Sequence, residues 1–264
     1  MLLSLLTALL LSIPMAHGQQ AGQGHTHSHE GSGTAKCGFD HLNDHLKATK
    51  PGFAEWYKDY IKKELPRMQE AYAQQQSQGA QRGVNTLYIP VVFHIIHNAG
   101  EQPGEGQNLS DQQIMETMDR LNEDFAALNP SFNETPDRFK SSVGNPDIQF
   151  CLAAFDPDGN PTTGIERHVY TITGTGTSNN SYENQIKDEV NWDPFRYMNV
   201  YTGTIPSPGV GGYAYLPSPS IIGSSTDGIV MNYLSTRGSS STLTHEVGHY
   251  LGLPHTFNGD SCGA

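Results

Sequence analysis

Basic residues are scarce in this chain of 264 residues, which carries 15 Lys and Arg against 27 Asp and Glu for a formal net charge of −12. The acidic balance argues against nucleic acid or an anionic membrane surface as a partner. A solvated acidic surface on a secreted protein accounts for the charge. The carboxylates also leave calcium (Ca²⁺) open as a bound ion, although the sequence contains no ordered EF-hand-like loop.

No apolar run in the chain is long enough to span a membrane. The opening MLLSLLTALLLSIPMAHG holds about a dozen apolar residues before its helix-breaking proline, which is too few to span a bilayer. It is typical of a secretory signal peptide, residues 1–18, with cleavage near Gly18. The sequence therefore predicts a secreted, extracellular protein with no membrane partner, and it leaves the oligomeric state open.

Two common functional patterns are missing, and cysteine is rare. No G-x-S-x-G turn is present for a Ser-His-Asp hydrolase, and the glycine-rich GTGTSNN lacks the strand-to-helix setting of a phosphate-binding loop. The three cysteines are Cys37, Cys151 and Cys262. An odd number in an exported protein leaves at least one thiol without an internal partner.

The rest of the chain divides by composition into three parts. Gly, Gln, Ser and His dominate residues 19–36, which predicts a disordered leader. Residues 37–83 carry apolar residues at helical spacing, with a break expected at Pro66, and we interpret them as a helical pro-segment. Residues 84–264 mix strands and helices in an order that predicts one α/β (α+β) domain.

The predicted domain begins with a buried strand and a long helix. TLYIPVVFHIIHN is almost continuously apolar, as expected for a strand covered on both faces, and its His94 and His97 are expected to be packed and hydrogen-bonded rather than ligands. Ser110 begins the helix with a capping box to Gln113. The apolar stripe of this helix, ended by Pro130, is predicted to comprise Ile114, Met118, Leu121, Phe125 and Leu128.

The most informative stretch is THEVGHYLGLPH, near the end of the sequence. His245 and His249 are four residues apart and therefore lie on one face of a helix. Gly252 readily takes the left-handed conformation that ends a helix and turns the chain, which allows His255 to approach the other two. The apolar stripe roughly opposite the first two histidines comprises Leu243, Val247 and Leu251.

This spacing predicts a catalytic metal site. Three neutral imidazoles, from His245, His249 and His255, hold zinc (Zn²⁺) with a fourth position open for water. Glu246 lies beside the first ligand without being one, and its carboxylate can accept a proton as the water attacks a carbonyl. The alternative is that these are ordinary polar residues on a helix surface.

The stretch STLTHEVGHYLGLPHTF resembles the extended zinc-binding motif of the metzincin metalloproteases, and in particular that of the pappalysin family. The resemblance continues through TLYIPVVFHIIHN, DIQFCLAAFDPDGNPTTGIER, YMNVYTG and DGIVMNY, and covers about residues 86–257. It implies a zinc metalloendopeptidase, made as a zymogen, that acts on protein or peptide substrates. It also implies the upper subdomain of a metzincin, a twisted mixed five-stranded sheet backed by two long helices with the zinc helix last.

The resemblance further implies a substrate-binding strand at about residues 212–217. An extended peptide adds to such a strand through main-chain hydrogen bonds. The alternative is an ordinary edge strand with a glycine bulge. The candidate substrate-binding residues are Gly212, Tyr213, Ala214 and Tyr215.

The pair Cys37-Gly38 resembles a feature of some metzincin zymogens, including relatives among the pappalysins. In those zymogens a Cys-Gly pair places its thiolate on the zinc and excludes the catalytic water. The alternatives are a disulfide from Cys37 to Cys262 or Cys151, or a free thiol. Cys262 itself corresponds to the first of several disulfide cysteines in the family.

One expected feature of the family is missing from the sequence. The family places a methionine-containing turn and a tyrosine tens of residues beyond the third histidine, whereas nine residues follow His255 here. Met231 and Tyr233 precede the zinc helix and cannot form that turn. The sequence therefore also allows an inactive fragment whose lower subdomain is missing, or a non-catalytic zinc-binding module.

Overall fold

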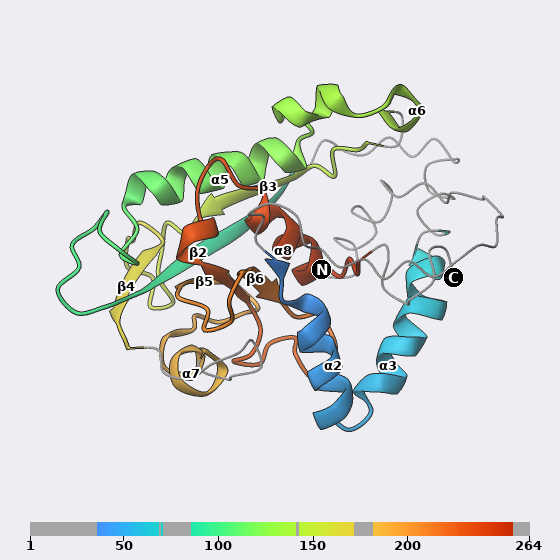
Figure 1. The fold of residues 1–264 in the computed structure, drawn as a ribbon, viewed down its shortest axis with the longest axis horizontal. Helices are drawn as coiled ribbons and strands as arrows, with labels where there is room; N and C mark the ends of the chain where they lie inside the picture. The colour runs from blue at the N-terminus through green and yellow to red at the C-terminus, as the bar shows by residue number, and fades with distance from the viewer. Residues whose placement is uncertain (1–35, 69, 71–85, 141–142, 172–181, 256–264) are drawn as a thin grey trace.

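Helices cover both faces of one mixed β-sheet in the computed structural model of the chain (Figure 1). The structure describes residues 36–68, 70, 86–140, 143–171 and 182–255. The expected signal peptide, the leader up to residue 35 and Cys262 lie outside these ranges. None of the described helices is long and apolar enough to cross a membrane.

Seven strands form the sheet in the described part of the chain, in the order β1-β6-β7-β5-β2-β3, with β4 also paired to β2. Strand β6 is antiparallel to β7 and the other pairs are parallel, so the sheet is mixed as predicted. The strands are β1 (Lys36–Cys37), β2 (Leu87–His97), β3 (Ile148–Leu152), β4 (Ile165–Val169), β5 (Met198–Gly203), β6 (Val210–Ala214) and β7 (Ile229–Asn232).

The sheet is larger than the five strands expected. Strand β2 has 11 residues, so its first half pairs with β3 and its second half pairs with β4 on the same side. The other additional strand, β1, comes from the expected leader and pro-segment and pairs with the edge of β6. The sequence shows neither pairing, because both join segments that lie far apart along the chain.

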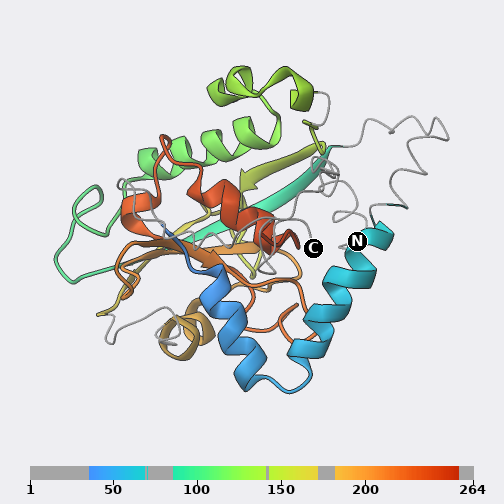
Figure 2. The ribbon, with the colours of Figure 1, turned by 45° about the vertical axis from the view of Figure 1, so that its right-hand side comes forward.

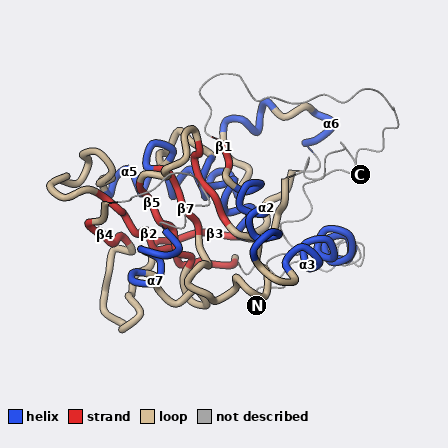
Figure 3. The backbone as a smooth tube through the Cα atoms, turned by 60° about the horizontal axis from the view of Figure 1, so that its bottom comes forward, coloured by secondary structure: helices blue, strands red, loops and turns tan. Residues whose placement is uncertain are grey.

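Buried side chains cover β2 on both faces, as the sequence predicted. On one face Val91, Phe93 and Ile95 pack in a core shared with α5 (Asp111–Phe125) and α8 (Thr242–Tyr250). On the other face Ile96 packs in a second core with residues of α2 (Phe39–Thr49). Figure 3 shows the strand layer between α5 and α7 (Lys187–Val190).

Helix α5 begins as predicted, with the reciprocal capping box of Ser110 and Gln113. The first four residues of its apolar stripe are buried, but Leu128 is 76% exposed. The helix ends at Phe125 rather than at Pro130, because Ala127 takes a positive φ of 57° and turns the chain. The short elements that follow or stand between strands are η3 (Pro130–Glu134), α6 (Asp137–Lys140), η4 (Tyr182–Ile186) and η5 (Tyr233–Ser235).

The expected pro-segment is helical, and its break lies earlier than predicted. Helices α2 and α3 (Phe53–Asp59) meet at Gly52, whose φ of 79° turns the chain (Figure 2). A π-helical turn, η2 (Tyr60–Glu64), follows α3, and residues 65–68 are again helical. The expectation of a break at Pro66 was therefore wrong, because the wider turn before the proline accommodates it.

Candidate metal centre

Helix α8 presents two histidines and buries its opposite side. Leu243 and Val247 lie in the core beside α5, at 1% and 0% exposure. Gly252 ends the helix with a φ of 101°, and its N–H donates to the carbonyl of His249 at 2.8 Å. This turn directs the chain back toward the helix and brings His255 beside the other two imidazoles, as the sequence predicted.

The Nε2 atoms of the three histidines converge. They lie 3.0 Å apart between His245 and His249, and 3.2 Å from each of these to His255. Nitrogen ligands of tetrahedral zinc, at about 2.0–2.1 Å from the metal, are separated by about 3.3 Å. The cluster is thus of a size that holds one metal ion.

The environment keeps two of these imidazoles neutral. Burial lowers the pKa of His249 to about 3, and it also lowers the pKa of His245. The His249 Nδ1 lies against the carbonyl of Leu253, so the proton resides on Nδ1 and the Nε2 lone pair points into the cluster. Neutral imidazole with a free Nε2 is the form that binds a metal.

Residues of the expected pro-segment contact this cluster directly. The Phe39 ring stacks on His249 with centroids 3.8 Å apart, and it meets His255 edge-on at 5.0 Å. Both carboxylate oxygens of Asp40 lie 3.1 Å from the Nδ1 of His255, and this hydrogen bond lowers the pKa of Asp40. Tyr60 donates its hydroxyl to the carbonyl of Gly252 at 2.7 Å.

Sequence reasoning did not identify these contacts. It singled out Cys37 in the run AKCGFD and assigned no role to the phenylalanine and aspartate that follow it. A signal was available, because a residue three positions after a cysteine placed at the metal must itself lie near the ligands. The structure brings Phe39 and Asp40 to the metal centre from the start of α2.

Glu246 lies between the histidines and β6. It is fully buried, and a Cβ atom added to Gly212 would lie 2.9 Å from its Cγ. A glycine is therefore required at position 212, because any side chain there would displace the side chain of Glu246. Ala214 faces the same core, which it shares with α8.

The expected substrate-binding strand is paired with the expected pro-segment. Strand β1 runs parallel to β6, with Cys37 opposite Gly212. The N–H of Gly38 donates to the carbonyl of Gly212 at 2.8 Å. The backbone of the Cys-Gly pair therefore lies beside the strand that contacts Glu246, while the side chain of Cys37 lies outside what the structure describes.

The two tyrosines of the candidate strand face away from the histidines, over a buried ion pair. Lys187 is fully buried and lies 2.7 Å from the Glu183 carboxylate, and it also donates to the carbonyl of Thr226. Tyr213 donates its hydroxyl to Glu183 at 3.1 Å. The Lys187 ammonium lies 5.9 and 5.3 Å from the ring centroids of Tyr213 and Tyr215. The ion pair thus packs against the tyrosines of this strand on the face of the sheet opposite the histidines.

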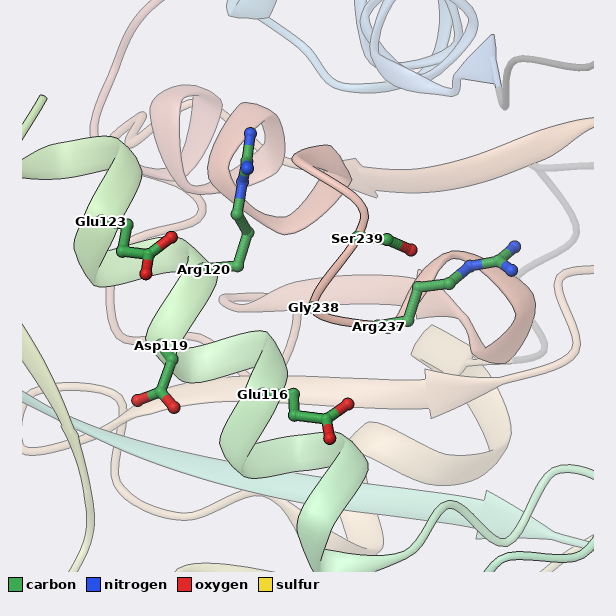
Figure 4. A pocket seen from close by; sticks show the side chains of 7 residues that line it. All are labelled: Glu116, Asp119, Arg120, Glu123, Arg237, Gly238 and Ser239. Atoms are coloured by element: carbon green, nitrogen blue, oxygen red, sulfur yellow. The ribbon is translucent and has the colours of Figure 1, made fainter. Parts of the chain in front are cut away.

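Polar contacts with α5 fix the first turn of α8. Thr244 donates its hydroxyl to the Asp124 carboxylate at 2.7 Å, and Arg120 pairs with Asp124 at 3.0 Å. Arg120 also points from α5 toward the start of α8 (Figure 4), where it donates to Ser241 at 2.7 Å. None of the three clustered histidines lines the pocket in that figure, which is lined by Glu116, Asp119, Arg120, Glu123, Arg237, Gly238 and Ser239.

The histidines of β2 have structural roles, as predicted. His94 is fully buried, bonds Asn199 at 2.9 Å and lies 3.3 Å from His168, and its burial lowers its pKa to about 3. His97 bonds a neighbouring carbonyl. Cys151 is exposed and free. Among the described residues, the three histidines of the metal centre are the one group of His, Cys, Asp or Glu side chains placed to hold a metal ion. The expected calcium ion has no candidate ligands in this part of the chain.

Comparison with known proteins places this centre in a family. The family described as Pregnancy-associated plasma protein-A matches residues 180–264, which include the three histidines. A mutant of Tannerella forsythia promirolysin has a TM-score of 0.62 and 31% sequence identity to the chain, covering 86% of this chain and 71% of promirolysin. The chain belongs to the pappalysin family of metalloproteases. Its fold is that of the metzincins, as the resemblance implied.

Other relatives of this pappalysin are fungal and bacterial. An extracellular metalloprotease of Verticillium alfalfae is 28% identical over 190 residues, 68% of this chain and 55% of the relative. One of Colletotrichum graminicola is 31% identical over 185 residues, 66% of this chain and 54% of the relative. The chain thus spans about half the length of these curated relatives. Mature mirolysin of T. forsythia, in complex with a cleaved peptide, gives a TM-score of 0.56 at 35% identity, covering 67% of each chain.

Proposed function

We propose that this pappalysin is the precursor of a secreted zinc endopeptidase that hydrolyses peptide bonds in extracellular proteins or peptides. The observation that carries this proposal is the convergence of three imidazole Nε2 atoms within 3.2 Å beside the buried Glu246. Zinc bound there would polarise the carbonyl of the substrate and lower the pKa of a bound water. His245, His249 and His255 hold the metal, and Glu246 accepts the proton of the attacking water.

Strand β6 supplies the surface for the substrate in this proposal. Its main-chain groups at Gly212 lie beside Glu246, so an extended peptide paired with them passes the metal centre. Tyr213 and Tyr215 point to the opposite face and therefore set the position of the strand rather than contact the substrate. Ala214 and Gly212 leave the side of the strand toward α8 free of large side chains.

The proposal includes latency. Residues 1–18 are the signal peptide, and residues 37–83 are the pro-segment that is removed from the catalytic domain at residues 84–264. This latency is supported by the contacts of β1 with β6 and of Phe39 with His249. The match to promirolysin covers 86% of this chain, against 67% for mature mirolysin. This difference in coverage supports the proposed pro-segment.

Removal of zinc is expected to abolish proteolysis by the processed, full-length protein. The reason is that zinc held by the three histidines would polarise the substrate carbonyl and lower the pKa of the attacking water, and Glu246 alone does neither. The measurement is cleavage of a denatured protein before and after treatment with a zinc chelator, with activity restored by added zinc. Zinc binding without any cleavage would instead identify a non-catalytic zinc module, and failure to bind zinc would refute the proposal.

Replacement of Cys37 by Ala is expected to make the full-length precursor active or self-cleaving without an added protease. A thiolate at the metal excludes the catalytic water, and the backbone of Cys37 lies opposite Gly212, next to Glu246. The matched control is Cys151→Ala, which changes a free, exposed thiol on β3. If Cys37→Ala is as latent as the parent, the helical pro-segment blocks the centre without help from Cys37.

A further inference from the structure

Asp40 contacts the one histidine of the metal centre that no helix holds. His245 and His249 project from α8, whereas His255 follows the turn at Gly252 and lies outside regular secondary structure. Both oxygens of Asp40 lie 3.1 Å from its Nδ1. The His255 side chain is 7% exposed and that of Asp40 is 52% exposed, so the carboxylate lies on the solvent side of His255.

This contact sets which nitrogen of His255 binds a metal. A carboxylate accepts the proton of Nδ1, which leaves the lone pair on Nε2, and Nε2 is the atom that lies 3.2 Å from the other two ligands. The same hydrogen bond fixes the ring orientation and raises the basicity of the ligand nitrogen. The Nδ1 of His249 is held in the same way by the backbone carbonyl of Leu253.

The neighbours of Asp40 hold it at this position. Phe39, the preceding residue, is fully buried and its ring contacts the rings of both His249 and His255. Asp40 belongs to the first turn of α2, where the helix dipole favours a negative charge. Asp40 is thus a pre-positioned carboxylate aimed at a metal ligand from a segment more than 200 residues away in sequence.

We infer that Asp40 is a positioning residue for zinc uptake, so that the pro-segment helps the precursor to acquire and hold the metal that it later leaves behind. This inference rests on the proposed zinc site. It gives the pro-segment a second role. The first turn of α2 not only covers the metal centre but also provides the carboxylate that orients His255. The precursor therefore binds zinc more tightly than the same chain without the Asp40 carboxylate.

The test is zinc affinity, measured on the precursor by competition with a chromogenic zinc chelator. All proteins carry Glu246→Gln to prevent self-cleavage. Asp40→Ala is expected to weaken zinc binding by about 10–100-fold, the usual cost of removing a partner of a metal-bound histidine. Asp40→Asn is expected to recover part of the loss, since its amide oxygen accepts the same proton. The control, Asp44→Ala, removes an exposed carboxylate one turn further along α2 that pairs with Lys47.

The outcomes separate this inference from the proposed function. Zinc binding that is equally tight in the parent and in Asp40→Ala overturns the role of Asp40 and leaves the zinc site intact. A parent protein that binds no zinc overturns the zinc site itself. Equal weakening in Asp40→Ala and Asp44→Ala also overturns the inference, because it assigns the effect to general charge rather than to the contact with His255.

Discussion

Glu246→Gln is expected to lower kcat of the processed enzyme by about 10²- to 10⁴-fold, the usual contribution of a general base. Glutamine has the same shape as glutamate, so it fills the buried space beside Gly212. It cannot accept a proton from an attacking water. The three histidines keep their positions on α8 and its turn, and zinc affinity is therefore expected to stay within about twofold of the parent.

The measurement for Glu246 pairs steady-state cleavage of a peptide with zinc content after dialysis. Glu116→Gln is the matched control, because Glu116 is an exposed carboxylate on α5 that is not part of the centre. Its kcat is expected to equal that of the parent. A Glu246→Gln enzyme that retains both zinc and full activity would show that another group accepts the proton.

Lys187→Met is expected to destabilise the protein by about 3–5 kcal/mol, the cost of breaking a buried ion pair on one side. The Glu183 carboxylate, 10% exposed, loses its partner at 2.7 Å and stays buried. Burial, and then the Glu183 charge, raises the pKa of Tyr213 and Tyr215, so both hydroxyls stay protonated. These tyrosines cannot neutralise the charge that remains.

Urea unfolding of the precursor measures this cost, and an exposed pair provides the comparison. Lys63 and Asp59 have the same four-residue spacing and a similar separation of 2.8 Å, but their side chains are 68% and 58% exposed. Lys63→Met is therefore expected to cost less than about 1 kcal/mol. The double variant Lys187→Met with Glu183→Gln is expected to recover at least about 1 kcal/mol of the loss. If Lys187→Met costs no more than Lys63→Met, the buried pair does not support β6.

Local spacing explains what the sequence could predict. The three histidines at 245, 249 and 255 lie within one helix and its turn, so helix geometry and the conformational freedom of Gly252 are sufficient to bring them together. The capping box of Ser110 is equally local, and it was confirmed to the residue. Strand β2 could be predicted because a strand that is buried on both faces has to be apolar throughout.

Long-range pairing explains what could not be predicted. The contact of Asp40 with His255 joins residues 215 positions apart, and no periodicity in either segment records it. Leu128 continues the helical spacing of α5, yet it is exposed because the chain turns at Ala127. In YENQIKDEV, Lys187 has the pattern of a solvent-exposed charge. Its burial depends on its pairing with Glu183 and on Tyr201 of β5 and Tyr213 of β6.

The two-residue strand β1 also covers an edge of the sheet. An edge strand with unpaired N–H and C=O groups is a template for association with another chain, and a short glycine-containing strand such as β6 has few side chains to prevent it. In the structure, the backbone of Lys36 and Cys37 pairs with that edge. If the proposed pro-segment is removed, that edge of β6 is left without β1, and both a peptide substrate and a second molecule of the protein can then pair with it. The β1–β6 pairing thus also protects the molecule against edge-to-edge association.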